Sequence, residues 1–339
     1  MKFYTLLALS STYLASHAAS SALPRTQQAS CSSLSGSNVH VVYQFAKGTW
    51  LENIAERTNG DLLVTLVDRP ELYQIDHRNP VNATLVHKFP GYTSLLGISE
   101  TSPDVFAIIT EKSNISAEGR TGSCAIWTVS FDGDKRAQVS KITDVPEANF
   151  LNGMTTLDAK AGKILVSDSG RGLVLRVDIP YANYTTVLDN ETFKPIPNAS
   201  IPFGVNGIRV HNGYLYYTNT LASIYGRVKI NLDTGEAVAP FETISSDILG
   251  DDFAIDRQGN AYIAANSKNE VVRVSRRGRT KVIAGSLNST LVPGPTSAIF
   301  GKLPSSSGKQ VLYVTTAGGL TGPINGTYVE GGKIIALEV

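Results

Sequence analysis

The sequence is short of the residues that nucleophilic hydrolases use. It has 5 histidines and 2 cysteines in 339 residues, and no Gly-x-Ser-x-Gly segment. Without that segment the chain lacks the elbow that presents the serine of an α/β-hydrolase. Neither cysteine stands in a context that pairs it with a histidine, so a cysteine nucleophile is disfavoured as well.

The chain also lacks a strong charge of either sign and, after its N-terminus, a long apolar run. Lys and Arg number 30 and Asp and Glu 29, which gives a net charge of +1. Nucleic acid is therefore not an expected partner, because its recognition needs a basic groove. No later segment reaches the roughly 18 apolar residues of a membrane helix, so no membrane span is expected.

The N-terminus has the pattern of a secretory signal. Lys2 precedes an apolar run, and small residues follow at 18–22. This order predicts a signal peptide over residues 1–22, with an N-terminal anchor as the alternative. A Ser-rich tail over residues 23–38 then leads into the folded part of the chain.

Seven Asn-x-Ser/Thr sequons agree with an extracellular or secretory-pathway location. Such sites accept N-linked glycans in secreted proteins. In an oxidising compartment Cys31 and Cys124 form a disulfide or remain two unrelated thiols, and both alternatives stay open. The sequons are Asn82, Asn114, Asn183, Asn190, Asn198, Asn288 and Asn325.

One signature recurs six times: a turn, a polar or small residue, an apolar strand and a second strand. Its starts are separated by 44, 56, 54, 45 and 45 residues. A period near 45 built from short strands predicts an all-β, six-bladed β-propeller over residues 39–339. The segment HVVYQFA precedes the first repeat and is expected to close the ring against the last blade. The repeats start at Glu52, Leu96, Asn152, Asn206, Asp251 and Thr296.

The first residues of the repeats are expected to meet in a central funnel. Glu52, Asn152, Asn206 and Asp251 supply carboxylate and amide oxygens, which suit Ca²⁺. The alternative is a hydrogen-bonded polar plug, since such residues also form turns and cap strands. Leu96 interrupts the ring of donors, and none of His40, His77, His87 and His211 starts a repeat.

Aromatic side chains flank the repeat starts. They predict an apolar pocket with a few polar groups, the usual form of a small-molecule site, although each also suits packing between blades. Tyr225 is a candidate hydrogen-bond donor at the funnel mouth. With Leu96, the candidate substrate-binding residues are Trp50, Tyr92, Phe150, Phe203 and Phe253.

Several segments resemble the six-bladed propellers of the gluconolactonase, regucalcin and paraoxonase superfamily. They are WLENIAERTNGDLLVTLVDRPELYQID at 50–76, NGI at 206–208, DDFAIDRQGNAYIA at 251–264, and GPTSAIFG and LYVTTAGG at 294–301 and 312–319. The resemblance implies a calcium-dependent lactonase whose ligands match Glu52, Asn152, Asn206 and Asp251. The position of a catalytic histidine in paraoxonases matches Leu96, while Asn53 and Gly153 replace the acidic ligands of a second, structural calcium.

Within that superfamily the chain resembles the secreted fungal hetero-Diels–Alderases of tropolone–sesquiterpenoid biosynthesis. This likeness implies a pericyclase that joins an o-quinone methide to a humulene-type alkene and needs no cofactor. Such a reaction requires two apolar partners held in register and one donor to the enone-like oxygen. The alternatives are a calcium-dependent lactonase using Asp251 or Asp252 as its base, and a non-catalytic propeller that binds a ligand or protein.

Overall fold

The computed structural model describes residues 39–339 except 77, 81, 113–121, 134–135, 200–202 and 303–307. The predicted signal peptide 1–22, the tail 23–38 with Cys31, His77 and the Asn114 sequon lie outside the described residues.

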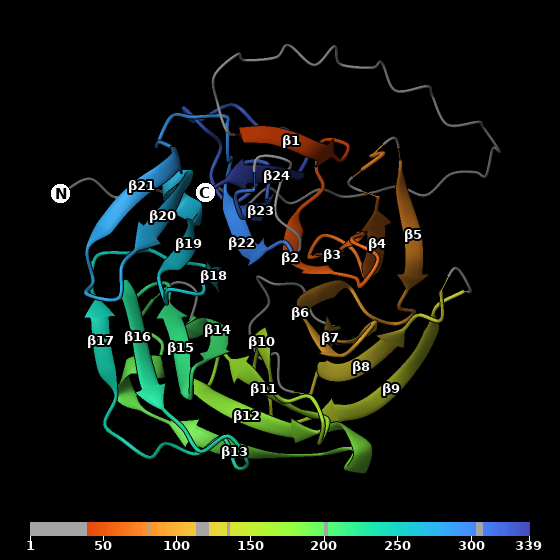
Figure 1. The fold of residues 1–339 in the computed structure, drawn as a ribbon, viewed down its shortest axis with the longest axis vertical. Coiled ribbons are helices and arrows are strands. Elements are labelled where there is room, and N and C mark those ends of the chain that lie inside the picture. The colour runs from red at the N-terminus through yellow and green to blue at the C-terminus, as the bar shows by residue number, and fades with distance from the viewer. Residues whose placement is uncertain are drawn as a thin grey trace. The chain divides into compact units, whose positions relative to one another are not determined.

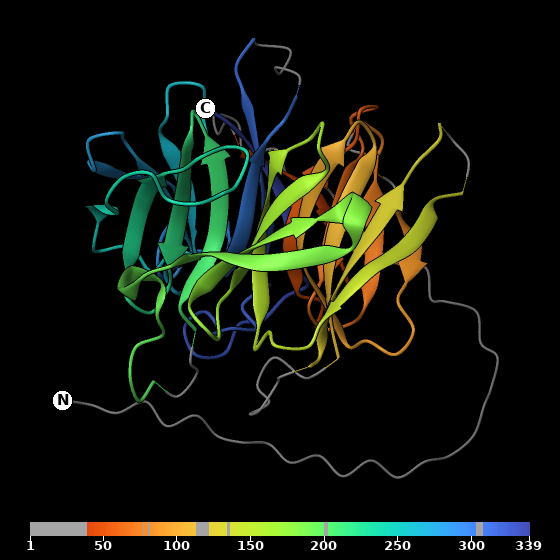
Figure 2. The ribbon, with the colours of Figure 1, turned by 90° about the horizontal axis from the view of Figure 1, so that it is seen from below.

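The described chain folds into six four-stranded antiparallel sheets arranged as blades around an axis (Figure 1). Figure 2 shows the strands of each blade running between the two faces of the ring. The predicted all-β, six-bladed propeller is therefore confirmed. Within the described ranges the helical segments are three-residue 3₁₀ turns, and none is long or apolar enough to cross a bilayer. These turns are η1 (Ile179–Tyr181), η2 (Glu191–Phe193) and η3 (Asn266–Lys268).

Each blade runs from an inner strand at the axis to an outer strand. Blades 1 and 2 consist of β2 (Leu51–Glu56), β3 (Leu62–Leu66), β4 (Glu71–Ile75), β5 (Ala83–Lys88), and β6 (Ser94–Ser102), β7 (Val105–Glu111), β8 (Cys124–Ser130), β9 (Gln138–Val145). Blades 3 and 4 consist of β10 (Leu151–Asp158), β11 (Lys163–Asp168), β12 (Leu173–Asp178), β13 (Asn183–Asp189), and β14 (Val205–His211), β15 (Tyr214–Asn219), β16 (Ile224–Lys229), β17 (Glu242–Ser245). Blades 5 and 6 consist of β18 (Phe253–Ile255), β19 (Ala261–Ala265), β20 (Glu270–Val274), β21 (Thr280–Gly285), and β22 (Pro295–Phe300), β23 (Val311–Thr316), β24 (Lys333–Glu338), β1 (Val39–Gln44).

Blade 6 closes the ring with strands from both ends of the propeller. The first strand, β1, pairs antiparallel with the last, β24, from Val39 opposite Leu337 to Gln44 opposite Lys333. The closure predicted from HVVYQFA is thus confirmed, and it leaves the ring without a free seam.

Burial along the strands explains why their sequences differ. The second strands β3, β19 and β23 are buried at every position, because neighbouring blades cover both of their faces. The outer strands β5 and β13 are mostly exposed or half-buried. The apolar core lies between blades: Leu62 and Val64 of blade 1, for example, pack in one cluster with Tyr313 and Ile334 of blade 6.

Candidate functional site

The inner strands bring the repeat starts to one end of the axis. Pairing between the inner and second strands breaks between Leu51 and Ile54, and between the equivalent residues of β10 and β14. Glu52, Asn152 and Asn206 lie in these breaks. Because a bulge turns its side chains out of the regular alternation, these polar groups face the axis end rather than the interior of a blade.

Glu52 and Asp251 form a pair of neighbouring carboxyl groups at this end. Glu52 is 7% exposed, and its Oε2 accepts a hydrogen bond of 3.0 Å from Trp50 Nε1. Asp251 is half-buried, and its two oxygens accept bonds from Asn206 Nδ2 at 2.9 Å and Asn266 Nδ2 at 3.3 Å. Each carboxyl group thus has amide or indole donors, and no cationic side chain of the described residues binds to it.

Burial raises the pKa of Glu52, the Trp50 bond lowers it and the negative charge of Asp252 raises it, and the net pKa is about 8. Burial also raises the pKa of Asp251 well above its usual range, with the charges of Glu52 and Asp252 adding to the effect. Like charges close together in a buried site cannot both ionise at low cost. Glu52 therefore holds its proton at neutral pH, and we call Glu52 and Asp251 the acid pair.

The Asn152 amide completes the polar floor of this end. It is 5% exposed, and among the described residues no hydrogen-bond partner contacts its side chain. Asn206 is held more firmly, because its Nδ2 also donates to Thr220 Oγ1 at 2.9 Å. A ligand at this end would find the Asn152 amide and two carboxyl groups of raised pKa.

An aromatic wall stands beside the acid pair. The rings of Phe150 and Phe203 stack with centroids 4.8 Å apart and an interplanar angle of 9°. Phe150 and Leu96 belong to one apolar cluster, against which the partly buried Trp50 and Phe203 also pack. Trp50, which binds Glu52, joins this wall to the acid pair, so four of the predicted substrate-binding residues lie together.

Three predicted site residues lie elsewhere. Tyr225 and Phe253 are buried at 2% and 0% exposure between blades 4 and 5, with their rings 5.4 Å apart. Tyr92 packs against Trp127 in blade 2, with centroids 5.9 Å apart. The structure does not bring these rings to the acid pair, because apolar burial inside the blades holds them.

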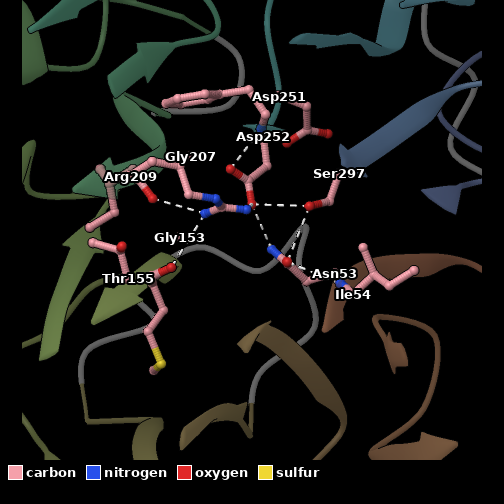
Figure 3. Close-up of polar contacts among 12 residues, drawn as sticks. Asn53, Ile54, Gly153, Thr155, Gly207, Arg209, Asp251, Asp252 and Ser297 are labelled. Carbon is pink, nitrogen blue, oxygen red and sulfur yellow. Dashed lines mark hydrogen bonds and ion pairs between the residues drawn. The ribbon is translucent and has the colours of Figure 1, made fainter. Parts of the chain in front are cut away.

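A buried polar centre surrounds Asp252, the residue that follows Asp251 (Figure 3). Asp252 Oδ2 accepts from Arg209 Nη2 at 2.6 Å, Asn53 Nδ2 at 2.9 Å and Ser297 Oγ at 3.1 Å. Asp252 is 2% exposed, so these bonds occupy a carboxylate that water barely reaches. Asp252 is thus engaged in the fold and not poised as a base.

Sequence reasoning missed Arg209 and Ser297, and a local signal was present only for Ser297. Ser297 directly follows a repeat start, at a place where glycine stands in blades 2, 3 and 4, whereas Arg209 lies three residues after its repeat start. A Cβ at Gly153 would lie 2.4 Å from the Asn206 carbonyl oxygen, and one at Gly207 would lie 2.3 Å from Asp252 Oδ1. Gly207 thus leaves room for the Asp252 carboxyl group, and Gly153 leaves room for the backbone of the neighbouring inner strand.

Sequence reasoning also missed a set of hydroxyl groups that tie neighbouring blades together. Thr65, Ser167 and Thr218 each accept from an inner-strand amide of their own blade. Each also donates to the carbonyl group of the next repeat start, at 2.7, 2.6 and 2.5 Å. The available signal was a Ser or Thr at the same place in three second strands. Their bonds fix the backbone position of the repeat starts Leu96, Asn206 and Asp251.

Cys124 lies away from this floor as a buried free thiol. Its Sγ donates to Glu111 Oε2 at 3.0 Å, and burial raises its pKa. Its predicted partner, Cys31, is outside the described residues, so the disulfide stays a prediction.

The acid pair makes stability fall as pH rises. Since the pKa of Glu52 is 4.5 when unperturbed and about 8 in the fold, the folded state holds more protons between these values. We expect the free energy of unfolding, measured with urea, to fall as the pH is raised from 4.5 to about 8. The fall should be smaller in Glu52→Gln. Equal slopes in the two proteins would contradict the protonation of Glu52.

Comparisons with known proteins agree with this architecture. No family model matches the chain. A protein of Sarocladium schorii described as "Putative hetero-Diels-Alderase asR5" is 26% identical over 313 residues, which cover 81% of this chain and 77% of that protein. A Phoma sp protein described as "Putative hetero-Diels-Alderase" is 27% identical over 310 residues, covering 81% of this chain and 85% of that protein.

Among solved structures, the regucalcin of Agrobacterium tumefaciens, a calcium-binding protein, superposes with a TM-score of 0.60. Its identity is 14%, and the match covers 88% of this chain and 92% of that chain. At this identity the likeness shows the fold alone. The protein is therefore a six-bladed propeller with regucalcin-like structural neighbours and distant homology to the two fungal sequences described as hetero-Diels–Alderases.

Proposed function

We propose that this protein is a pericyclase that catalyses an intermolecular hetero-Diels–Alder reaction. The observation that carries the proposal is the protonated Glu52 carboxyl group beside a stacked aromatic wall, in a chain distantly homologous to the two fungal sequences. No histidine of the described ranges lies at this end of an inner strand: His40 is on β1, His87 on β5, and His211 ends β14. The site thus offers acid and apolar surface without a hydrolytic base.

The substrates we propose are an o-quinone methide, from a hydroxymethyl tropolone or polyketide precursor, and a humulene-type sesquiterpene. The precursor loses its benzylic-type hydroxyl group and one ring-hydroxyl proton as water. Glu52 would give its proton to the departing hydroxyl group and take up the ring-hydroxyl proton in return, so that it is again a donor for the next step. The resulting C=C–C=O unit then adds to the alkene. One C–C and one C–O bond form, closing a dihydropyran with no atom gained or lost.

The chain's own residues would accelerate this addition in two ways. The partly buried Phe203 and Trp50 would hold the two apolar partners face to face, with the buried Phe150 ring supporting Phe203 from behind, which lowers the entropic cost of their encounter. The Glu52 carboxyl proton would bond to the heterodiene oxygen and stabilise the negative charge that grows there in the transition state. Trp50 orients Glu52 through the 3.0 Å bond to the carboxyl group's other oxygen.

The test is product formation from purified protein, a quinone-methide precursor and humulenol. We expect dihydropyran to form faster than in buffer and with one stereochemistry in excess. Product at the buffer rate and without stereoselectivity would overturn the proposal. If the protein bound the alkene tightly without turnover, the result would instead favour the alternative function of a non-catalytic propeller that binds a ligand.

A calcium-dependent lactonase is the competing function, and the donor set at the acid pair fits a hard cation. Glu52 and Asp251 carboxylates with the Asn152 and Asn206 amide oxygens are the ligand types Ca²⁺ prefers. A bound cation would keep both carboxyl groups ionised and polarise a substrate carbonyl group. A lactonase nevertheless needs a base. Leu96 is a buried apolar residue, Asp252 is bound by Arg209, and Asp251 would be occupied as a ligand of the cation.

Chelation separates the two functions. We expect cycloaddition to survive EDTA, because the reaction uses protons and apolar surface. At pH values above 8 the Glu52 carboxyl group is ionised, so we expect added Ca²⁺ to raise the thermal midpoint of unfolding there. The rise should be smaller in Asp251→Asn. Lactone turnover that EDTA abolishes would favour the lactonase.

We also propose that the protein is secreted and glycosylated. Five of the seven sequon asparagines are exposed: Asn82, Asn183, Asn198, Asn288 and Asn325. Asn190 is half-buried and accepts from the Thr192 amide at 3.0 Å, so we expect it to be the least modified of the six described sites. Protein from a eukaryotic host should lose mass on treatment with an N-glycanase, and an unchanged mass would contradict the proposal.

A further inference from the structure

A hollow unrelated to the acid pair lies at the other end of blades 4 and 5. Its volume is about 270 Å³. His211, the last residue of β14, lies at its edge, whereas Asn206 near the start of that strand belongs to the acid-pair end. Tyr214 and Tyr216 of β15 form part of its wall. The two sites therefore sit at opposite ends of the same inner strand.

Three arginines line this hollow, and no carboxylate does. Arg227 is already paired: its Nη2 lies 2.8 Å from Glu242 Oε2, and its guanidinium lies 4.7 Å from the centre of the Tyr214 ring. Arg257 and Arg276 are exposed, and neither has an ion pair or hydrogen-bond partner in the described part of the chain. Two positive charges thus share one hollow without compensation.

The position of Arg276 is set by the turn that it crosses. Gly259 adopts φ = +80°, and a Cβ there would lie 3.1 Å from Arg276 Cδ and 3.2 Å from its Cγ. The arginine stem therefore lies against the glycine of the β18–β19 turn, next to Arg257. A stem held in this way loses less conformational entropy when its guanidinium binds a ligand.

We propose that this hollow binds a small oxyanion, with a phosphate monoester as the best match. Guanidinium groups bind phosphate and carboxylate oxygens through paired, charge-assisted hydrogen bonds. Arg257 and Arg276 supply the uncompensated charge, and Arg227 adds donors already oriented by Glu242 and Tyr216. The tyrosine rings give room for a small organic group on the ester.

Calorimetric titration of the full chain with phenyl phosphate, and separately with inorganic phosphate, tests the proposal at low salt. We expect wild type to bind both, and Arg257→Gln/Arg276→Gln to weaken binding about tenfold or more. The matched control is Arg277→Gln/Arg279→Gln, which removes the same charge from exposed arginines of blade 5 that do not line the hollow. The control should bind as wild type does, and all three proteins should share one thermal midpoint.

Two results would overturn the proposal: no binding by wild type at millimolar phosphate, or an equal loss in the control pair, which would reveal only diffuse charge. Tighter binding of phenyl phosphate than of inorganic phosphate would support contact between its ring and the tyrosines. Equal binding of both would support recognition of the oxyanion alone.

Discussion

Replacing Glu52 by glutamine should slow the cycloaddition about 100-fold and remove the alkaline limb of its pH–rate profile. In wild type the carboxyl group is protonated below its pKa of about 8 and donates to the heterodiene oxygen. Above that pH it ionises and cannot donate, so the rate falls. Glutamine keeps the shape and a weaker N–H donor that does not titrate in this range, which leaves a slower and flat profile.

The measurement is the initial rate of dihydropyran formation, corrected for the uncatalysed rate, on both sides of pH 8. Trp50→Phe is the informative partner variant. Its indole bond lowers the pKa of Glu52, so its loss should move the alkaline limb to higher pH. An alkaline limb that persists in Glu52→Gln would assign the titration to another group and contradict the role of Glu52.

The blades could be predicted because each repeats a local pattern. A turn followed by apolar strands recurs six times, and second strands such as β3 and β19 are apolar because they are covered on both faces. The closing strand β1 was also foreseeable, since a β-rich segment before the first repeat has only blade 6 to complete. The fold could thus be predicted from short-range sequence signals, because the same pattern is repeated six times.

The site was less predictable, because its geometry depends on where each strand bulges. Glu52, Asn206 and Asp251 meet as their places in the repeat imply, and the Asn206–Asp251 bond is one result. Nearness to a repeat start says little about direction, however: Phe253 follows Asp252 directly and its ring is buried inside blade 5. Arg209 was beyond reach for the same reason, since its partner Asp252 lies 43 residues away on another blade.

Replacing Arg209 by methionine should destabilise the fold by about 3–5 kcal/mol, because it leaves a buried carboxylate without its cation. The Asp252 side chain is 3% exposed and that of Arg209 17%, so water cannot take over the lost 2.6 Å contact. Urea unfolding of the variant at neutral pH gives the measurement. Lys141→Met is the control, since the Lys141–Asp144 pair has side chains 36% and 55% exposed and should contribute less than about 1 kcal/mol.

The double variant Arg209→Met/Asp252→Asn tests whether charge or shape causes that loss. Asparagine can still bond to Asn53 and Ser297, and no unpaired charge remains in the buried centre. We therefore expect the double variant to be more stable than Arg209→Met, and equal stabilities would contradict the argument. Since the charge of Asp252 raises the pKa of Glu52, its removal should also move the alkaline limb of the pH–rate profile to lower pH. The buried centre would then both hold the inner strands together and help to keep the proton on Glu52.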